Sequence, residues 1–216
     1  MSPSTQLPLW KNVLAVIAHP DDESFGLGGV IDAFTRQGST VTVLCLTRGE
    51  ASTLGASPDL AETRARELDA AARELGAAST VLLNFPDGGL ADSSQDELAA
   101  RVASEARGID GFLVFDRTGI TGHPDHVTAT GVAVDVAEER GLPVLAWTLS
   151  EDIASTLRAE TGAPFAGSSS DIVLTVDRSR QRLAIDHHVS QAVPGSVLWR
   201  RLELQGDEEH LVWLRR

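Results

Sequence analysis

The sequence has little of several residue types, and each shortage excludes a class of structure. Cys45 is the single cysteine among 216 residues, so no disulfide can form within the chain, which fits a reducing compartment. No apolar run approaches the ~20 residues that a membrane-spanning helix needs. Residues 1–9 lack the basic and apolar regions of a signal peptide. We therefore expect a cytoplasmic protein that does not enter a membrane.

Positive charge is scarce as well. The chain has 18 Lys and Arg residues against 31 Asp and Glu residues, which gives a formal net charge of -13 at pH 7. A surface of that sign repels the phosphates of nucleic acids and the head groups of anionic lipids. We therefore expect neither nucleic acid nor membrane as a partner, and a small molecule is the more compatible ligand.

Strand-like and helix-like segments alternate along most of the chain. Its length and its 42% of hydrophobic residues suit one soluble domain over residues 1–216. The alternation predicts an α/β fold with a mostly parallel sheet flanked by helices. The expected strands are 13–18, 41–46, 81–85, 111–115, 144–149 and 172–176. The expected helices are 28–37, 58–75, 96–106, 127–140 and 178–191. A short C-terminal β element, a hairpin of 202–204 and 211–214, is expected to end the fold.

Two short clusters of metal-ligating side chains follow apolar, strand-like runs. The first cluster, Ala-His-Pro-Asp-Asp-Glu at 18–23, comes directly after the apolar run 13–17. The second, Gly-His-Pro-Asp-His at 122–126, comes shortly after the apolar run 112–115. In an open α/β sheet, ligands bind at the carboxyl ends of the strands. We therefore expect the two clusters to meet at that edge of the sheet.

The spacing within the clusters suits a metal ion. His19 and Asp22 are three residues apart, and His123 and His126 repeat this spacing. Residues three apart share one face of a helical turn, so each pair can present two ligands to one ion. Two imidazoles and one carboxylate, with a fourth position left for water, make a catalytic zinc site. Pairs with this spacing also occur by chance on solvated surfaces, and the ligand types do not separate zinc from iron(II).

A hydrolytic site also needs groups that move protons. Asp21 is a spare carboxylate beside Asp22, and it is the candidate for accepting the proton of an attacking water. His123 is a spare imidazole, and it is the candidate for protonating a leaving amine or stabilising an oxyanion. Together the clusters predict a metal-dependent hydrolase.

The two motifs together resemble those of the PIG-L (LmbE-like) family of zinc-dependent N-deacetylases, and the resemblance extends from about residue 19 to residue 191. It implies a Rossmann-like fold and hydrolysis of a linear amide, the acetamide of an N-acetylglucosamine-type substrate. It also implies that His19, Asp22 and His126 bind one Zn²⁺ per chain, with Fe²⁺ as the alternative ion. Asp21 would be the general base, and His123 would assist the carbonyl and the leaving amine.

Further positions resemble the parts of the family pattern that surround the substrate. The resemblance implies substrate contacts from Glu50 in Thr-Arg-Gly-Glu, Arg64 in Arg-x-x-Glu, Asp87 in Pro-Asp-Gly and His188 in His-x-Ser-Gln. Each motif also has an ordinary structural explanation. Arg64 and Glu67 can form a surface ion pair, Pro-Asp-Gly is good turn chemistry, and His188 can be a simple core or surface histidine.

The leading hypothesis is a zinc-dependent hydrolase that removes an acetyl group from an N-acetylated amino sugar or related small molecule. The alternative substrate is a larger thiol-conjugate or natural-product amide. The alternative class is a non-catalytic metal- or nucleotide-binding α/β module, because residues 26–29 contain Gly-x-Gly. A dinucleotide fingerprint needs its glycines in the turn after the strand, where residues 19–23 stand instead. The chain also has no tyrosine to assist an oxyanion. Neither the substrate nor the oligomeric state follows from the sequence.

Overall fold

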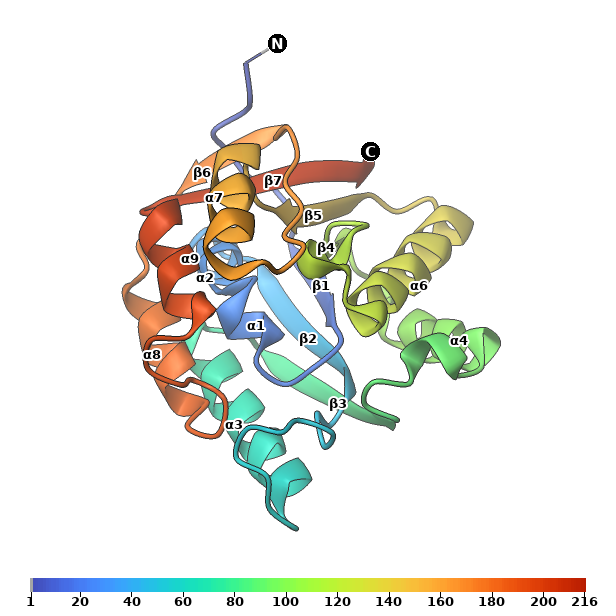
Figure 1. Cartoon of the computed structure of the whole chain (residues 1–216). Coiled ribbons are helices and arrows are strands. Elements are labelled where there is room, and N and C mark those ends of the chain that lie inside the picture. The colour runs from blue at the N-terminus through green and yellow to red at the C-terminus, as the bar shows by residue number, and fades with distance from the viewer. Residues whose placement is uncertain (1) are drawn as a thin grey trace.

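The computed structural model describes residues 2–216, and it contains one seven-stranded sheet with helices on both faces (Figure 1). The strand order is β3-β2-β1-β4-β5-β7-β6. Strands β1 to β5 pair in parallel, whereas β7 is antiparallel to both of its neighbours. The strands are β1 (Asn12–Ile17), β2 (Thr40–Thr47), β3 (Ser79–Phe85), β4 (Gly111–Phe115), β5 (Val144–Thr148), β6 (Ile172–Thr175) and β7 (Glu208–Arg215).

Two layers of helices enclose the sheet. In Figure 1, α3 and α8 lie on one side of the strands, and α4 and α6 lie on the other. The helices are α1 (Asp22–Phe25), α2 (Gly28–Arg36), α3 (Leu60–Glu74), α4 (Gln95–Glu105), α5 (Gly119–Gly122), α6 (Pro124–Arg140), α7 (Glu151–Thr161), α8 (Ser179–His187) and α9 (Val197–Gln205), with the 3₁₀ turn η1 (Leu90–Asp92). Within residues 2–216, no helix has both the length and the apolarity to cross a bilayer.

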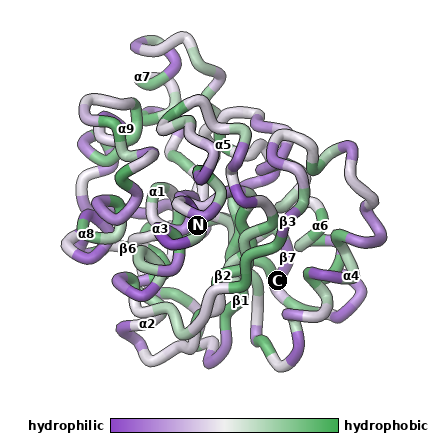
Figure 2. Tube along the Cα trace, turned by 90° about the horizontal axis from the view of Figure 1, so that it is seen from below, coloured by the Kyte–Doolittle hydropathy of each residue, from purple (hydrophilic) through white to green (hydrophobic). Residues whose placement is uncertain are grey.

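Strand β1 shows why an apolar run becomes a central strand here. Val13, Ala15 and Ile17 belong to the core under α2 and α3. Leu14 and Val16 belong to the core under α4 and α6. Successive side chains of a strand point to opposite faces, so a strand that is covered on both faces needs apolar residues throughout. Figure 2 shows β1 and β2 as hydrophobic segments in the middle of the molecule.

The α/β fold with a mostly parallel sheet is confirmed, and so are all six expected strands. The expected helices are also present, and two of their ends are shifted by three residues or more. Helix α6 begins at Pro124 rather than at 127, because His123 caps it and proline at the first helical position has a suitable φ. Helix α8 ends at His187, so the expected continuation to 191 is wrong.

The expected C-terminal hairpin is wrong, although its second arm is a strand. Residues 202–204 belong to α9, whereas residues 211–214 belong to β7, which pairs with β5 and β6. Helix α7, which the sequence reasoning did not predict, packs against α9.

The edge formed by the carboxyl ends of β1 and β4 carries the candidate site. Strand order reverses between these neighbours, because β1 leads on to β2 and β3 while β4 leads on to β5. Such a switch point leaves a crevice in which ligands bind. The first cluster follows β1, and the second follows β4 through the short helix α5.

Candidate active site

Three side chains from the two clusters converge at this edge. His19 follows β1, Asp22 begins α1, and His126 lies in the first turn of α6. Their ligand atoms all lie within 4.8 Å of one another. His126 Nε2 is 3.2 Å from His19 Nδ1 and 3.2 Å from Asp22 Oδ1. Two ligands of a tetrahedral zinc ion, each at ~2.0–2.1 Å, are about 3.3 Å apart, so the spacing fits one ion.

Hydrogen bonds on the far side of each ring determine where the protons lie. His19 Nε2 is 3.1 Å from Asp125 Oδ2 and 3.1 Å from Asp87 Oδ1, so this nitrogen donates. His126 Nδ1 is 3.2 Å from the carbonyl oxygen of Gly119 and also donates. In the neutral rings, the two nitrogens that face each other therefore both carry lone pairs, beside a carboxylate oxygen. Three electron-pair donors that face one another with no hydrogen atom between them repel one another. A cation bound between them removes this repulsion, as in a His₂Asp metal site.

The pKa values show the same preference for positive charge. Burial opposes the charged form of His19, but the hydrogen bonds to Asp125 and Asp87 outweigh it and raise its pKa to about 10. Burial likewise opposes ionisation of Asp22, and the charges of His126 and His19 nevertheless hold the pKa of this carboxyl below its usual range. The site is therefore built to hold positive charge, carried either by a proton or by a metal ion.

A second His/Asp group shares His19. It consists of His19, His123 and Asp125, whose ligand atoms also lie within 4.8 Å of one another. The oxygens of Asp125, however, already accept the N–H groups of Gly88 at 2.7 Å and Leu90 at 3.1 Å. The group with Asp22 and His126 is therefore the better candidate for holding an ion.

Asp21 lies beside this group with a free face toward the pocket. Its backbone φ is 140°, a value that non-glycine residues rarely adopt and that stores strain. Its N–H donates to Glu23 Oε2 at 3.0 Å, and its Oδ2 accepts from Arg64 at 2.9 Å. Burial is the largest influence on this carboxyl, and it raises the pKa to about 6 although the charge of Arg64 opposes it. Such a pKa suits a general base near neutral pH.

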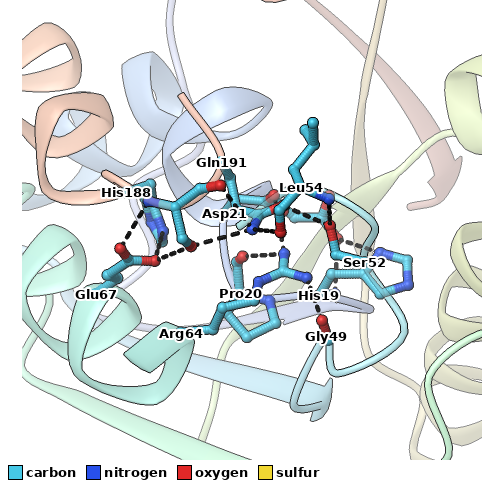
Figure 3. Close-up of polar contacts among 12 residues, drawn as sticks. His19, Pro20, Asp21, Gly49, Ser52, Leu54, Arg64, Glu67, His188 and Gln191 are labelled. Carbon is cyan, nitrogen blue, oxygen red and sulfur yellow. Dashed lines mark hydrogen bonds and ion pairs between the residues drawn. The ribbon is translucent and has the colours of Figure 1, made fainter. Parts of the chain in front are cut away.

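Arg64 of α3 holds the carboxylate of Asp21 in place (Figure 3). The side chain is only 3% exposed, and its guanidinium donates to the carbonyl oxygens of Gly49 at 2.6 Å and Pro20 at 2.5 Å. A Cβ at Gly49 would lie 2.0 Å from the guanidinium, so only glycine leaves room for the arginine. These bonds hold the guanidinium against the protein, but Arg64 also lines the pocket, so the substrate contact implied by the sequence stays a prediction.

His123 caps helix α6 and faces the other two imidazoles. Its Nδ1 accepts the N–H of Asp125 at 3.2 Å, so the neutral ring carries its proton on Nε2. Its centroid is 4.9 Å from the rings of His19 and His126. Burial lowers the pKa of His123, and the positive charges of His126 and His19 lower it further. His123 is therefore a neutral N–H donor beside the candidate metal group.

The pattern of these residues agrees with a known family. The family model described as PIG-L, GlcNAc-PI de-N-acetylase, matches residues 14–137, a span that contains both clusters. The chain belongs to the PIG-L family. The resemblance inferred from the motifs is thereby confirmed.

Curated relatives of this PIG-L chain carry deacetylase names. The probable N-acetylglucosaminyl-phosphatidylinositol de-N-acetylase of Schizosaccharomyces pombe is 34% identical over 136 residues, which cover 59% of this chain and 52% of the relative. The probable N-acetyl-alpha-D-glucosaminyl L-malate deacetylase 2 of Bacillus anthracis is 29% identical and covers 95% of this chain and 92% of the relative. This chain therefore spans about half the length of the yeast relative and most of the bacterial one.

Solved structures with the same fold include both a deacetylase and a hydratase. The A40926 pseudoaglycone deacetylase Dbv21 superposes with a TM-score of 0.72 and 22% identity, covering 94% of this chain and 96% of that chain. GalB, the 4-carboxy-2-hydroxymuconate hydratase of Pseudomonas putida, superposes with a TM-score of 0.69 and 20% identity, covering 95% and 97%. The PIG-L fold alone therefore does not specify hydrolysis, so the reaction has to be inferred from the residues of the site.

Two of the four expected substrate contacts, Arg64 and Asp87, line the pocket of this PIG-L chain, whereas Glu50 and His188 do not. Asp87 Oδ1 approaches His19, and its Oδ2 accepts the N–H of Ala51 at 2.8 Å. Glu50 is exposed, and its Oε1 accepts the N–H of Asp87 at 3.1 Å. Asp87 thus lines the pocket and also orients His19, while Glu50 supports the loop that carries Asp87.

His188 is fully buried, which does not fit the implied substrate contact. Its exposed fraction is 0%, and its Nε2 lies 2.6 Å from Glu23 Oε1, whose side chain is also buried. Glu23 in turn accepts the N–H of Asp21. His188 therefore supports the strained turn at Asp21 from behind, through Glu23.

Replacing His188 with glutamine is expected to lower the free energy of unfolding by about 3–5 kcal/mol near pH 6, because Glu23 loses its buried partner. Burial opposes the charged form of His188, but Glu23 outweighs it and raises the pKa above 6.5. The stabilisation is therefore complete below the unfolded pKa of about 6.5 and is lost as the pH rises through the folded value. Urea unfolding of the wild type and the variant, near pH 6 and near pH 9, measures the loss of unfolding free energy at each pH.

The exposed neighbour His187 offers a matched control for this experiment. Its replacement with glutamine is expected to change the unfolding free energy by less than about 0.5 kcal/mol at either pH. An equal cost of the His188 substitution at both pH values would show that His188 is uncharged in the folded protein.

Residues that the sequence reasoning did not single out complete the pocket, which has a volume of about 520 Å³. Gln191 and Ser52 line it, and Ser52 Oγ donates to Gln191 Oε1 at 2.9 Å. Ser190 donates its N–H and hydroxyl to Glu67 at 2.9 and 2.6 Å (Figure 3). The loop after β2 is thus attached to the segment after α8. The only signal in the sequence was the His-x-Ser-Gln motif.

Proposed function

We propose that this PIG-L chain is a zinc-dependent N-deacetylase, which hydrolyses the acetamide of an N-acetylated amino sugar or a related small molecule. The observation that carries the proposal is the convergence of His19, Asp22 and His126 beside the free carboxylate of Asp21. The deacetylase names of relatives that are 34% and 29% identical support it.

His19, Asp22 and His126 would hold the ion through one nitrogen each of the histidines and one oxygen of the aspartate. Bound there, Zn²⁺ would polarise the amide carbonyl and lower the pKa of a water. Fe²⁺ accepts the same ligands, so the donor set favours both ions over the harder Mg²⁺ and Ca²⁺. Asp125 and Asp87 would orient His19 from behind through its Nε2 proton.

Asp21 would accept the proton of the attacking water. Its Oδ2 is engaged by Arg64, which leaves Oδ1 for the proton. A pKa of about 6 makes the carboxyl mostly ionised at pH 7. As the oxygen of the water bonds to the carbonyl carbon, the proton passes to Asp21 Oδ1. Asp21 then returns the proton to the amide nitrogen, the carbon–nitrogen bond breaks, and acetate and the free amine leave.

His123 would stabilise the carbonyl oxygen with a hydrogen bond. Because its Nδ1 already accepts the N–H of Asp125, only Nε2 can donate, and the ring is neutral when it does so. A neutral imidazole at the start of a helix donates a hydrogen bond to developing negative charge. His123 thereby supplies the assistance for which this tyrosine-free chain has no phenol.

The pocket suits a polar small molecule. Its volume of about 520 Å³ lies in the range of ligand sites, roughly 300–1,000 Å³. Asp87, Ser52 and Gln191 line it with oxygen and nitrogen atoms that can bind the hydroxyl groups of a sugar. The same walls can accept a thiol-conjugate or natural-product amide, which remains the alternative substrate.

An amine-release screen over N-acetylglucosamine derivatives and thiol conjugates tests the proposal. We expect free amine from at least one compound, loss of turnover after treatment with a chelator, and recovery when Zn²⁺ is restored. Turnover that persists without metal would overturn the metal-dependent mechanism. Tight Zn²⁺ binding without turnover of any compound would favour the non-catalytic metal-binding module.

A further inference from the structure

A second cavity adjoins the candidate metal group, because Asp22 and His126 are among its lining residues. Its volume is about 220 Å³. Asp22, Phe25 and His126 line both this cavity and the larger pocket. The two spaces therefore share two of the proposed metal ligands, and the second cavity contains neither Asp87 nor Gln191 of the larger pocket's polar rim.

The walls of the cavity are mostly aromatic and aliphatic. Phe115 ends β4, Trp147 lies in β5, and their ring centroids are 5.2 Å apart. The Phe115 ring also stands at 89° to the His126 ring at 4.9 Å. A Cβ at Gly26 would lie 2.5 Å from the Phe115 ring, so glycine is needed for the ring to occupy this position. The chain thus builds an apolar space directly against a proposed metal ligand.

One lining residue, Arg201, is charged, and its polar contacts are made with the surrounding protein. Arg201 of α9 is 5% exposed, and its guanidinium carbon lies 5.0 Å from the centroid of the Trp147 ring. The guanidinium donates to the carbonyl oxygen of Phe25 and to Gln205. Gln205 donates in turn to Glu209, which also accepts the indole N–H of Trp147. These bonds tie α9 to α1 and keep the cavity open.

Backbone strain occurs at the same wall. Ile120, which lines the cavity, has a φ of 69°, and a β-branched residue rarely adopts a positive φ. Its N–H donates to Thr118 Oγ1 at 3.1 Å, and its carbonyl oxygen accepts the N–H of Ala166 at 2.7 Å. Such strain persists where surrounding structure enforces it, and it is concentrated at functional sites. The strained conformation places the side chain of Ile120, which is 5% exposed, at this cavity.

From this arrangement we infer that the cavity is an acyl pocket, and that the enzyme accepts N-acyl groups larger than acetyl, with about four to eight carbons. The inference rests on the proposed hydrolysis. A carbonyl carbon at the metal group has two substituents, which must leave it in different directions. The polar pocket suits the amine-bearing sugar, and the apolar cavity suits the acyl chain. A cavity of about 150 Å³ lined by aliphatic and aromatic groups can hold benzene, so 220 Å³ holds a six-carbon chain.

A series of N-acyl glucosamines with acetyl, butanoyl, hexanoyl and octanoyl groups tests the inference on the metal-loaded protein. Each buried methylene is expected to raise kcat/KM roughly fourfold up to hexanoyl, as the transfer of a methylene from water to an apolar space predicts. A value that stays level or falls from acetyl to hexanoyl would overturn the acyl pocket. It would leave the proposed deacetylation intact, since the acetyl compound is still hydrolysed.

Two valines with equal exposure provide a matched pair of variants. Val197 and Val193 are each 42% exposed, and only Val197 lines the cavity. Val197→Trp fills part of the cavity. We expect this variant to lower the ratio of kcat/KM for the hexanoyl compound to kcat/KM for the acetyl compound at least about tenfold. This is roughly the effect of losing the burial of two methylenes. Val193→Trp is expected to leave that ratio as in the wild type. Equal effects of the two substitutions would contradict the assignment, and circular dichroism verifies that both variants fold.

A binding measurement separates the cavity from the chemistry. Trp147 lies in the wall, so hexanoate is expected to change the tryptophan fluorescence of the metal-loaded protein, and acetate at the same concentration is not. Trp147→Phe should remove that signal, and Val197→Trp should weaken hexanoate binding. Hexanoate binding without hydrolysis of any amide would refute the proposed function and keep the apolar site. Absence of a fluorescence change, together with a flat acyl series, would refute the site.

Discussion

Replacing Asp21 with asparagine is expected to reduce kcat about 10²–10⁴-fold while Zn²⁺ binding is retained, because the variant keeps the ligand group and loses the base. The amide oxygen of asparagine can still accept the hydrogen bond from Arg64 that now ends on Oδ2 of Asp21. Asparagine also tolerates positive φ better than most residues, so the strained turn should survive. Amine release measures kcat, and competition with a chromophoric chelator measures the affinity for Zn²⁺.

Asp92 provides the control for this substitution, because it is an exposed aspartate in the 3₁₀ turn η1. Asp92→Asn should leave both kcat and zinc affinity unchanged. If Asp21→Asn retained kcat within tenfold, another group would have to be the base. If turnover and zinc binding disappeared together, Asp21 would be a structural residue of the metal site, and the proposed proton path would be wrong.

The fold was predictable where burial leaves a local pattern. Strands β1 and β4 are apolar along nearly their whole length because helices cover both faces of the sheet. The C-terminal region lacked such a signal. Residues 202–204 alternate like a strand, but Leu198 and Leu202 are one helical turn apart and bury one face of α9 in a small core. Strand β7 depends on β5, about 60 residues earlier in the chain, so local pattern did not reveal its pairing.

The candidate site also has one part that the sequence predicts and another that it does not. The ligands at the ends of β1 and β4 were predictable, because parallel strands bring their carboxyl ends to one edge. The supports that come from distant helices were not predictable. Arg64 reaches Asp21 only because α3 packs beside α1, and His188 reaches Glu23 only because α8 packs there as well. Such contacts across 43 and 165 positions depend on helix packing, which no local pattern in the sequence reveals.

Asp125 is a further residue whose role depends on the tertiary structure. Asp125 stands between two histidines in the second cluster, where a carboxylate can either orient a ligand or face solvent, and the sequence does not decide between these roles. In the structure it is fully buried and accepts from His19 and from the N–H groups of Gly88 and Leu90. It therefore links the turn after β3 to the candidate metal group, a role that depends on where β3 ends relative to α6.

Removing His126 is expected to weaken Zn²⁺ binding far more than removing its neighbour Asp125. His126→Ala deletes one of three proposed ligands, so the loss should exceed the roughly 10–100-fold that removal of an outer hydrogen-bond partner costs. Asp125→Asn removes the charge that faces the Nε2 proton of His19 and replaces one accepting oxygen with an NH₂ group, and a loss of about 10–100-fold is expected. Competition with a chromophoric chelator at one fixed pH measures both affinities, and the exposed His187, replaced with alanine, should leave the affinity unchanged.

The ranking of these two variants decides between the two groups that can hold an ion. Both groups contain His19, but one adds Asp22 and His126 and the other adds His123 and Asp125. If Asp125→Asn abolished binding and His126→Ala did not, the ion would lie on the Nε2 side of His19. Asp22 would then not be a ligand, and Asp21 would have no reason to stand beside the attacking water. The larger effect at His126 is therefore what the proposed mechanism requires, because only the group with Asp22 places the free carboxylate of Asp21 next to the ion.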